Sequence, residues 1–408
     1  MNSEQVDVLV IGAGPSGAAA ASMVNRAGLK VKVVEKSTFP RFVIGESLLP
    51  RCMNHFEEMG VLEALKKQGY QKKIGASFRR DDKICQFEFA DQYSESWDWT
   101  WQVPRDEFDK VLADEVQAQG VDFEYETTVE TVKFSGSNSS TLVTGPDGEQ
   151  KEINAKFLVD ASGYGRVLPN LLDLNEPSTL PSRTSIFTHA VEPDESKRDD
   201  IERITIITIA QDVWFWIIPF SNGKTSIGFT GNTDYMDKFE GNNEEKMRKL
   251  LADHPYTKER FSESEFAIEV QRIDGYSIGI SKMFDEGYVL TGNTGEFLDP
   301  VFSSGVTLAL ESGLTAGKLA AKQVKGEGVD WQKEYAEYLG SGVEAFRVYV
   351  EAWYEGTLQD IFYSQIEDGK IKAQVTSILA GHVWKTDNPM IHKSAEILPV
   401  LAKMVSGG

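Results

Sequence analysis

Near its N-terminus the chain reads Val6-Asp7-Val8-Leu9-Val10-Ile11-Gly12-Ala13-Gly14-Pro15-Ser16-Gly17. The apolar run is typical of a buried parallel strand, and the residues from Ala18 to Arg26 favour a helix. In such a unit the first glycine permits a tight turn, the second lets a pyrophosphate approach the backbone, and the third lets helix and strand pack closely. Free N–H groups at the helix start attract the phosphates. We therefore predict a dinucleotide site at Gly12, Gly14 and Gly17.

The second strand of this unit is predicted from Leu29 to Val34, and Glu35 follows at its end. A carboxylate at this spacing binds the adenosine ribose in dinucleotide folds. Strand, helix and acid together complete one βαβ unit, which is more specific than the glycine pattern alone. We therefore add Glu35 to the predicted site and expect an α/β fold with a parallel sheet.

The remaining chain alternates between helix and strand patterns. Helices are predicted at Pro50 to Lys67, Arg105 to Gln119, Asn243 to Asp253 and Ser304 to Lys322, and again after Trp331. A pair of strands is predicted at Gly75 to Phe89, and single strands at Ser96 to Val103, Ile204 to Ile209, Val213 to Phe220, Lys224 to Thr230, and Phe266 to Arg272. We predict a discontinuous dinucleotide-binding domain of residues 1–75, 100–180 and 284–330. A sheet domain of residues 76–99 and 181–283 interrupts it, and a helical C-terminal region of residues 331–408 follows.

Composition excludes several classes of protein. The 408 residues contain 63 acidic and 42 basic side chains, a net charge of −21, which argues against binding duplex DNA. Cys52 and Cys85 cannot form a disulfide framework or a four-thiolate metal site, and the five histidines lack metal-ligand spacing. The longest apolar stretch, Val213 to Phe220, is far short of the roughly 20 residues of a spanning helix. We expect a cytoplasmic protein with no metal, no nucleic acid and no integral membrane segment.

Several segments stand where one flavoprotein group has its motifs: Arg41 to Pro50, Arg105, Leu158 to Gly163, and Gly292 to Gly305. Over nearly its whole length the chain resembles the para-hydroxybenzoate-hydroxylase-like FAD superfamily. The resemblance implies a Rossmann-like FAD-binding domain interrupted by a β-sheet substrate domain, with C-terminal helices. It implies FAD contacts at Arg41, Ser47, Arg105, Asp160 and Gly292. The usual Gly-Asp of the last element is Gly292-Asn293 here; asparagine can still hydrogen-bond a ribityl hydroxyl, so we expect weakened but retained FAD binding.

Two further segments resemble flavin-dependent halogenases, closest to the phenol and pyrrole types. The first is Trp214-Phe215-Trp216-Ile217-Ile218-Pro219, whose alternation puts both indoles on one face of a strand. In the family this wall, at Trp214 and Trp216, keeps substrate away from the flavin; a plain core strand is the other interpretation. The second runs from Phe297 to Val306 and opens a helix. The resemblance implies a halide held there by backbone groups of Ser304 and Gly305, although Ser304 could also be an ordinary N-cap.

The third halogenase-like feature is Lys73, within Gly69 to Phe78, where the phenol-type enzymes carry their lysine. In the family that lysine meets hypohalous acid and either forms a haloamine or hydrogen-bonds the oxidant. Burial would lower its pKa and make the amine nucleophilic. The alternative is a solvated loop lysine beside Lys72. Tyr70 replaces the family's phenylalanine, and Phe302 replaces an acid that the tryptophan-type enzymes use, which argues against indole chemistry of that kind.

We therefore predict an FAD-dependent oxidoreductase of the monooxygenase superfamily that is halogenase-like. It would use reduced FAD, oxygen and chloride or bromide to halogenate an electron-rich aromatic of the phenol or pyrrole type. Its partners would be a small aromatic substrate, free or tethered to a carrier protein, and a separate flavin reductase. The alternatives are a geranylgeranyl-reductase-like enzyme acting on a lipid-like substrate, an aromatic-ring monooxygenase reduced directly by NAD(P)H, and a flavin-binding protein without turnover.

Overall fold

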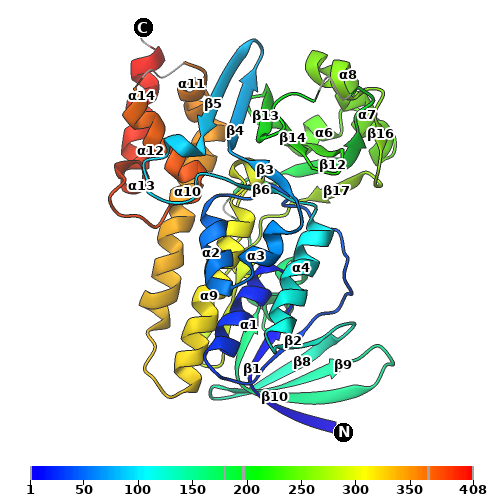
Figure 1. Cartoon of the computed structure of the whole chain (residues 1–408), viewed down its shortest axis with the longest axis vertical. Helices are drawn as coiled ribbons and strands as arrows, with labels where there is room; N and C mark the ends of the chain where they lie inside the picture. Colours follow the sequence, from blue (N-terminus) through cyan, green and yellow to red (C-terminus); the bar gives the residue numbers. More distant parts are fainter. Residues whose placement is uncertain (1, 179, 195–197, 365–367, 407–408) are drawn as a thin grey trace.

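The structure, a computed structural model, describes residues 2–178, 180–194, 198–364 and 368–406 and contains two large sheets (Figure 1). The first sheet has the order β19-β20-β10-β1-β2-β7, and all its neighbours are parallel except β19 and β20. Strands β8 and β9 form a hairpin, and β9 pairs antiparallel with the N-terminal half of β10. Its strands are β1 (Asn2–Ile11), β2 (Val31–Val34), β7 (Asp122–Glu124), β8 (Thr128–Ser135), β9 (Asn138–Thr144), β10 (Gln150–Asp160), β19 (Phe284–Asp285) and β20 (Tyr288–Leu290).

Helices cover this sheet because its central strands are apolar on both faces. Val8, Leu9 and Val10 of β1 are fully buried. The helices alongside are α1 (Pro15–Arg26), α4 (Arg105–Ala118) and α9 (Gly305–Val324), and α1 packs directly against both of the others. The predicted α/β fold with a parallel sheet is confirmed.

The second sheet is mostly antiparallel and lies in the other half of the molecule (Figure 1). Its order is β16-β12-β15-β14-β13-β4-β5, with β17 also pairing with β12. Alternation along β14 sends Trp214 and Trp216 into one core and Phe215 and Ile217 into another, beneath the short helices. The elements are β4 (Gly75–Arg80), β5 (Lys83–Glu88), β12 (Thr184–Val191), β13 (Arg203–Ala210), β14 (Val213–Pro219), β15 (Lys224–Gly231), β16 (Glu265–Phe266), β17 (Gln271–Asp274), α6 (Thr233–Met236), α7 (Asn243–Asp253) and α8 (Pro255–Phe261).

The C-terminal helices pack on the tryptophan side of this sheet. Trp353 is fully buried, with its ring centroid 5.4 Å from that of Phe78 in β4. These helices therefore cover the tryptophan face of the second sheet. They are a π-helical turn (Gln332–Glu337), α10 (Tyr338–Glu355), α11 (Thr357–Tyr363), α12 (Gly369–Leu379), α13 (Pro389–His392) and α14 (Ser394–Ser406).

Three predicted elements differ from the structure. The helix expected from Pro50 to Lys67 is two helices, α2 (Arg51–Met59) and α3 (Leu62–Lys66), because Gly60 adopts a left-handed φ of 70° and ends the first. The strand expected from Ser96 to Val103 is only β6 (Thr100–Gln102), paired with β3 (Gln71–Lys73). The strand expected from Phe266 to Arg272 is two short strands, β16 and β17, each of which pairs with β12.

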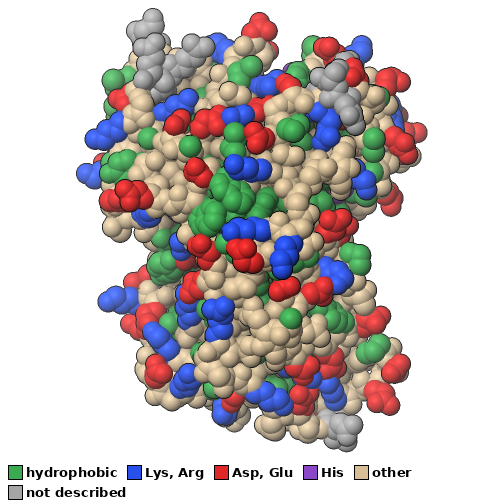
Figure 2. All heavy atoms as spheres, viewed as in Figure 1, with side chains coloured by type: hydrophobic (Ala, Val, Ile, Leu, Met, Phe, Trp, Pro, Cys, Tyr) green, Lys and Arg blue, Asp and Glu red, His purple; other side chains and the backbone are tan. Residues whose placement is uncertain are grey.

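Trp97 and Trp99 lie before the shortened strand and Trp101 lies within it, so the three do not share one face of a sheet. The rings of Trp97 and Trp99 lie edge to face at 5.5 Å, and those of Trp99 and Trp101 at 5.2 Å, so they pack on one another from the surface inward. Figure 2 shows hydrophobic side chains gathered at the level of β3 and β6, on a face where acidic and basic groups are otherwise interspersed. In the described part of the chain, no helix is long and apolar enough to span a bilayer.

Candidate active site

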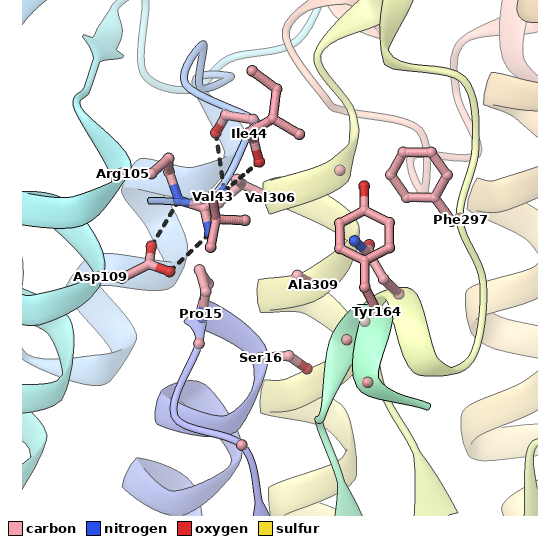
Figure 3. A pocket seen from close by; sticks show the side chains of 18 of the residues that line it. Pro15, Ser16, Val43, Ile44, Arg105, Asp109, Tyr164, Phe297, Val306 and Ala309 are labelled. Atoms are coloured by element: carbon pink, nitrogen blue, oxygen red, sulfur yellow. Dashed lines mark hydrogen bonds and ion pairs between the residues drawn. The ribbon is translucent and has the colours of Figure 1, made fainter. Parts of the chain in front are cut away.

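A cavity of about 650 Å³ extends from the glycine turn after β1 to the tryptophan face of β14. It lies between the two sheets, and segments from both line it. Figure 3 shows Arg105 and Asp109 on one side of it, Tyr164 and Phe297 on the other, and the start of α1 at one end. The cavity therefore joins the predicted dinucleotide site to the predicted tryptophan wall.

The glycine turn is shaped to receive a phosphate group. Gly12 has a φ of 99°, and a Cβ there would lie 2.5 Å from the Ala161 carbonyl oxygen. A Cβ on Gly17 would lie only 1.9 Å from the Gly12 carbonyl oxygen, so Gly17 packs inside while Gly12 and Gly14 line the cavity. The buried hydroxyl of Ser16, which lines the cavity at the start of α1, has no hydrogen-bond partner among the described residues. These residues fit the pyrophosphate of FAD.

Glu35 lines the cavity next to this turn and is almost fully buried. Its Oε2 accepts a hydrogen bond from the Ala13 N–H at 2.9 Å, and its Oε1 accepts one from the Ser37 N–H at 3.0 Å. Arg41 Nη2 lies 3.7 Å from Oε2. Glu35 thus holds the turn in shape, and a ribose hydroxyl would share these oxygens with backbone donors.

Arg105 holds one wall of the cavity in place. Its guanidinium binds both oxygens of Asp109, at 2.7 and 2.9 Å, and donates to the Ile44 and Gly45 carbonyls at 3.1 Å each (Figure 3). Arg41 lines the same wall. We call residues 41–47 the wall segment; Arg105 acts on the cavity largely by fixing its backbone.

The other predicted cofactor residues divide into two groups. Gly292 and Asn293 line the cavity, and the Gly292 N–H donates to Ser312 Oγ at 2.9 Å. Asp160 is fully buried and is not among the lining residues. Its carboxyl accepts hydrogen bonds from the N–H groups of Ser162 and Leu168, at 2.9 and 2.7 Å. Asp160 therefore shapes the turn that lines the cavity, and a direct contact with FAD remains a prediction.

The indoles of Trp214 and Trp216 lie on one face of β14 and line the cavity. Their ring centroids are 5.7 Å apart. Trp216 Nε1 donates to Ser226 Oγ at 3.1 Å, and Trp214 Nε1 donates to the Tyr354 hydroxyl at 2.9 Å. Both rings are thus held rigidly, which suits an aromatic wall.

Lys73 is buried rather than solvated, so the solvated-loop interpretation is wrong for this residue. Its side chain is 1% exposed, and its Nζ donates to Ser47 Oγ and to the Leu48 carbonyl at 2.8 Å each. Burial lowers the pKa of the Lys73 amine to about 7. Lys73 does not line the cavity, but Ser47 does. The amine is therefore separated from the cavity by one side chain.

The predicted halide turn lies at the start of α9. Ser303 has a left-handed φ of 57°, and Ser303 and Gly305 line the cavity, whereas Ser304 is buried behind them. A Cβ on Gly305 would meet nothing within 4 Å. Among the described residues, no carboxyl group hydrogen-bonds Ser304 or Gly305. Free N–H groups at this helix start can therefore face an anion in the cavity.

Sequence reasoning missed a buried cluster of polar groups around Asp299, immediately before this turn. The Tyr354 hydroxyl donates to Asp299 Oδ2 at 2.8 Å, and Tyr276 donates to the same oxygen at 3.2 Å. Burial raises the pKa of Asp299 above its usual range. Asp299 lies in the predicted halide segment, but Tyr276 and Tyr354 lie on other segments, so no local motif marks the cluster.

Comparisons with known proteins agree with this geometry. The FAD binding domain family matches residues 5–332. The 1H-pyrrole-2-carbonyl-[peptidyl-carrier protein] chlorinase of Pseudomonas fluorescens is 26% identical, over 99% of this chain and 93% of that protein. A solved flavoprotein/dehydrogenase from Cytophaga hutchinsonii is 51% identical with a TM-score of 0.97, over 99% of this chain and 100% of that chain. The structure of the flavin-dependent brominase Bmp2 is 25% identical with a TM-score of 0.83, over 97% of this chain and 99% of that chain.

Proposed function

Because this chain belongs to the FAD binding domain family, we propose that it is a flavin-dependent halogenase that attaches chloride or bromide to an electron-rich aromatic ring of the phenol or pyrrole type. The comparisons confirm the predicted FAD cofactor, the flavin-dependent oxidoreductase class and the halogenase-like resemblance. The observation that carries the proposal is one cavity that holds the tryptophan wall and the anion-facing turn, with the Lys73 amine directly behind Ser47.

Each residue has a defined task in this proposal. Reduced FAD, when bound, supplies the electrons that activate oxygen. The N–H groups at Ser304 and Gly305 hold the halide, and Trp214 and Trp216 bar the substrate from the flavin side of the cavity. Hypohalous acid passing Ser47 reaches the Lys73 amine, where N–H and O–X bonds break, an N–X bond forms and water leaves. The buried aromatic surroundings exclude bulk water from this amine.

The test supplies the purified protein with chemically reduced FAD, oxygen and bromide, and with a panel of phenols and pyrroles, each analysed by mass spectrometry. A brominated product is expected for at least one of them. The Pseudomonas fluorescens relative acts on a pyrrole carried by a peptidyl-carrier protein, so the panel includes pyrrole-2-carbonyl both free and on a carrier protein. Absence of brominated mass across the panel would contradict the proposal for these substrates.

A second candidate is a reductase or hydroxylase that takes hydride directly from NAD(P)H. The relative at 51% identity is described as a flavoprotein/dehydrogenase, which favours this candidate. Stopped-flow mixing of the FAD-loaded protein with NADPH separates the two. A halogenase served by a separate flavin reductase should keep its flavin oxidised on the timescale of turnover. Rapid bleaching of the flavin would support the second candidate instead.

Gly305→Val should weaken halide use without releasing FAD. A side chain at this position enters open cavity space beside the helix start, where the halide is proposed. The KM for bromide should rise about tenfold or more, which corresponds to about 1.4 kcal/mol, while FAD affinity stays within twofold. Gly340→Val is the matched control, because Gly340 is an exposed position of α10 and a Cβ there would also meet nothing within 4 Å. An unchanged bromide KM in Gly305→Val would place the halide elsewhere.

A further inference from the structure

Glu46, in the wall segment, is a buried acid, and one of its carboxyl oxygens has no hydrogen-bond partner among the described residues. Its side chain is 1% exposed and the residue lines the cavity. Oε1 lies 2.6 Å from His189 Nε2, whereas Oε2 has no hydrogen-bond partner among the described residues. A buried oxygen without a partner is costly, so its presence at a cavity wall points to a hydrogen-bond partner that arrives with the bound molecules, which can be the acceptor of a carboxyl proton.

Comparison with the other acids of the cavity singles out Glu46. Three acidic residues line it, Glu35, Glu46 and Asp109. Both oxygens of Glu35 accept backbone N–H groups, and both oxygens of Asp109 bind Arg105. Glu46 is therefore the lining acid whose side chain is free to exchange a proton with the cavity.

The surroundings of Glu46 hold it in one place. Its carbonyl accepts the Val103 N–H at 2.8 Å, and Arg105 binds the carbonyls of the two preceding residues. His189, on β12 of the second sheet, is itself held between the rings of Phe42 and Phe220, at centroid distances of 5.4 and 5.1 Å. The pair thus joins the wall segment to the second sheet and can pass a proton between His189 and Glu46.

The preceding residue places this acid near the halide turn. A Cβ on Gly45 would lie 4.0 Å from the side chain of Val306, which follows Gly305 at the start of α9. The wall segment and the halide turn therefore meet on the same stretch of cavity.

We propose that Glu46 is the catalytic acid of the halogenation step and that His189 is the positioning residue that resupplies its proton. The inference rests on the proposed function. FADH2, O2, X⁻, H⁺ and Ar–H give FAD, Ar–X and two waters, so one proton is consumed in each turnover. FADH2 and the halide each give up two electrons, and oxygen accepts all four. As the halide is oxidised, the proton moves from Glu46 to one of the two oxygen atoms of O2, which leaves as water, and His189 then returns a proton to Glu46.

Glu46→Gln tests this by separating binding from chemistry, because glutamine keeps the shape and loses the acid. Product formation should fall about 100-fold, as for loss of a general acid, and hydrogen peroxide should accumulate in its place. The dissociation constants of FAD and bromide, measured by flavin fluorescence, should stay within threefold. If Glu46 had only a structural role, FAD affinity and the melting temperature would fall in parallel with activity, and the proposal would be overturned.

Chemical rescue provides the second arm and remains decisive if Glu46→Gln folds poorly. Formate should raise the rate of product formation by Glu46→Ala at least tenfold over the rate without formate. Formamide, which has a similar shape and no acid group, should not raise this rate. Equal rescue by both compounds, or by neither, would overturn the proposal. A wild-type protein that brominates nothing in the panel would instead show that the proposed function itself has failed.

Discussion

Lys73→Met should abolish halogenation while FAD stays bound. Methionine retains the apolar stem and removes the amine, so packing around Phe89 and the cavity wall should persist. We expect product formation to fall at least about 100-fold, within the range for loss of a group that reacts directly. The measurement is brominated product per mole of FAD-loaded protein, with oxygen consumption recorded in parallel. Oxygen consumption should continue, because Lys73 lies outside the cavity.

Lys72→Met is the matched control, since Lys72 is the adjacent residue on β3 and its side chain lies at the surface over Trp99. It should leave product formation unchanged. A similar loss of activity in both variants would indicate a defect of β3 rather than of the amine. Full activity in Lys73→Met would remove Lys73 from the mechanism.

The pH dependence of Lys73 gives a readout that does not depend on halogenation. Burial lowers the pKa of this amine from 10.5 to about 7. Between these two pH values the unfolded chain binds one more proton than the folded protein, so this lysine makes stability rise with pH across that window. Lys73→Met should flatten this rise in the free energy of unfolding, measured by denaturant unfolding at several pH values.

In the wild-type protein, product formation should also increase as the Lys73 amine loses its proton through about pH 7.

Gly17→Ala should cost the protein its FAD and much of its thermal stability. The added Cβ would lie 1.9 Å from the Gly12 carbonyl oxygen and 3.3 Å from the Ala161 side chain, so α1 must move away from β1. Because the obstacle is backbone, we expect a loss of about 3 kcal/mol or more, at the upper end for overpacking. The measurements are FAD content after purification and the melting temperature.

Gly313→Ala, in α9, should have the same effect, because its Cβ would lie 2.2 Å from the Ser16 carbonyl oxygen of α1. Gly340→Ala is the control: it lies in α10 with open space around it and should be neutral or slightly stabilising. Normal FAD content in Gly17→Ala would show that the close contact of α1 with the turn is not required.

The local patterns predicted the first βαβ unit of the first sheet because they depend on neighbours in sequence. The apolar run ending at Ile11, the glycine turn and the acid at Glu35 all lie within one βαβ unit, and period-two alternation located β14 with both tryptophans on one face. The failures follow from the same dependence. Trp97 and Trp99 alternate like a strand, yet their rings pack on one another outside any sheet.

Site residues with partners far along the chain were beyond such patterns. Glu46 and His189 are 143 residues apart and carry no shared motif. Tyr354 reaches Asp299 from α10, 55 residues further along the chain. Asp160 shows the converse: its motif is local, but its carboxyl is occupied by backbone N–H groups, so its predicted contact with FAD is still to be tested.

The sequence by itself determined the dinucleotide fold, the residue types of the halogenase-like motifs and the acidity of −21, because these are properties of short segments and of composition. Only the tertiary structure decided what Lys73 is. A Lys-Lys pair on a chain is solvated by default, and here β3 turns one lysine outward over Trp99 and buries the other beneath Ser47. The physical reason is desolvation: the shift of the amine to a pKa of about 7 depends on side chains brought over it from distant segments.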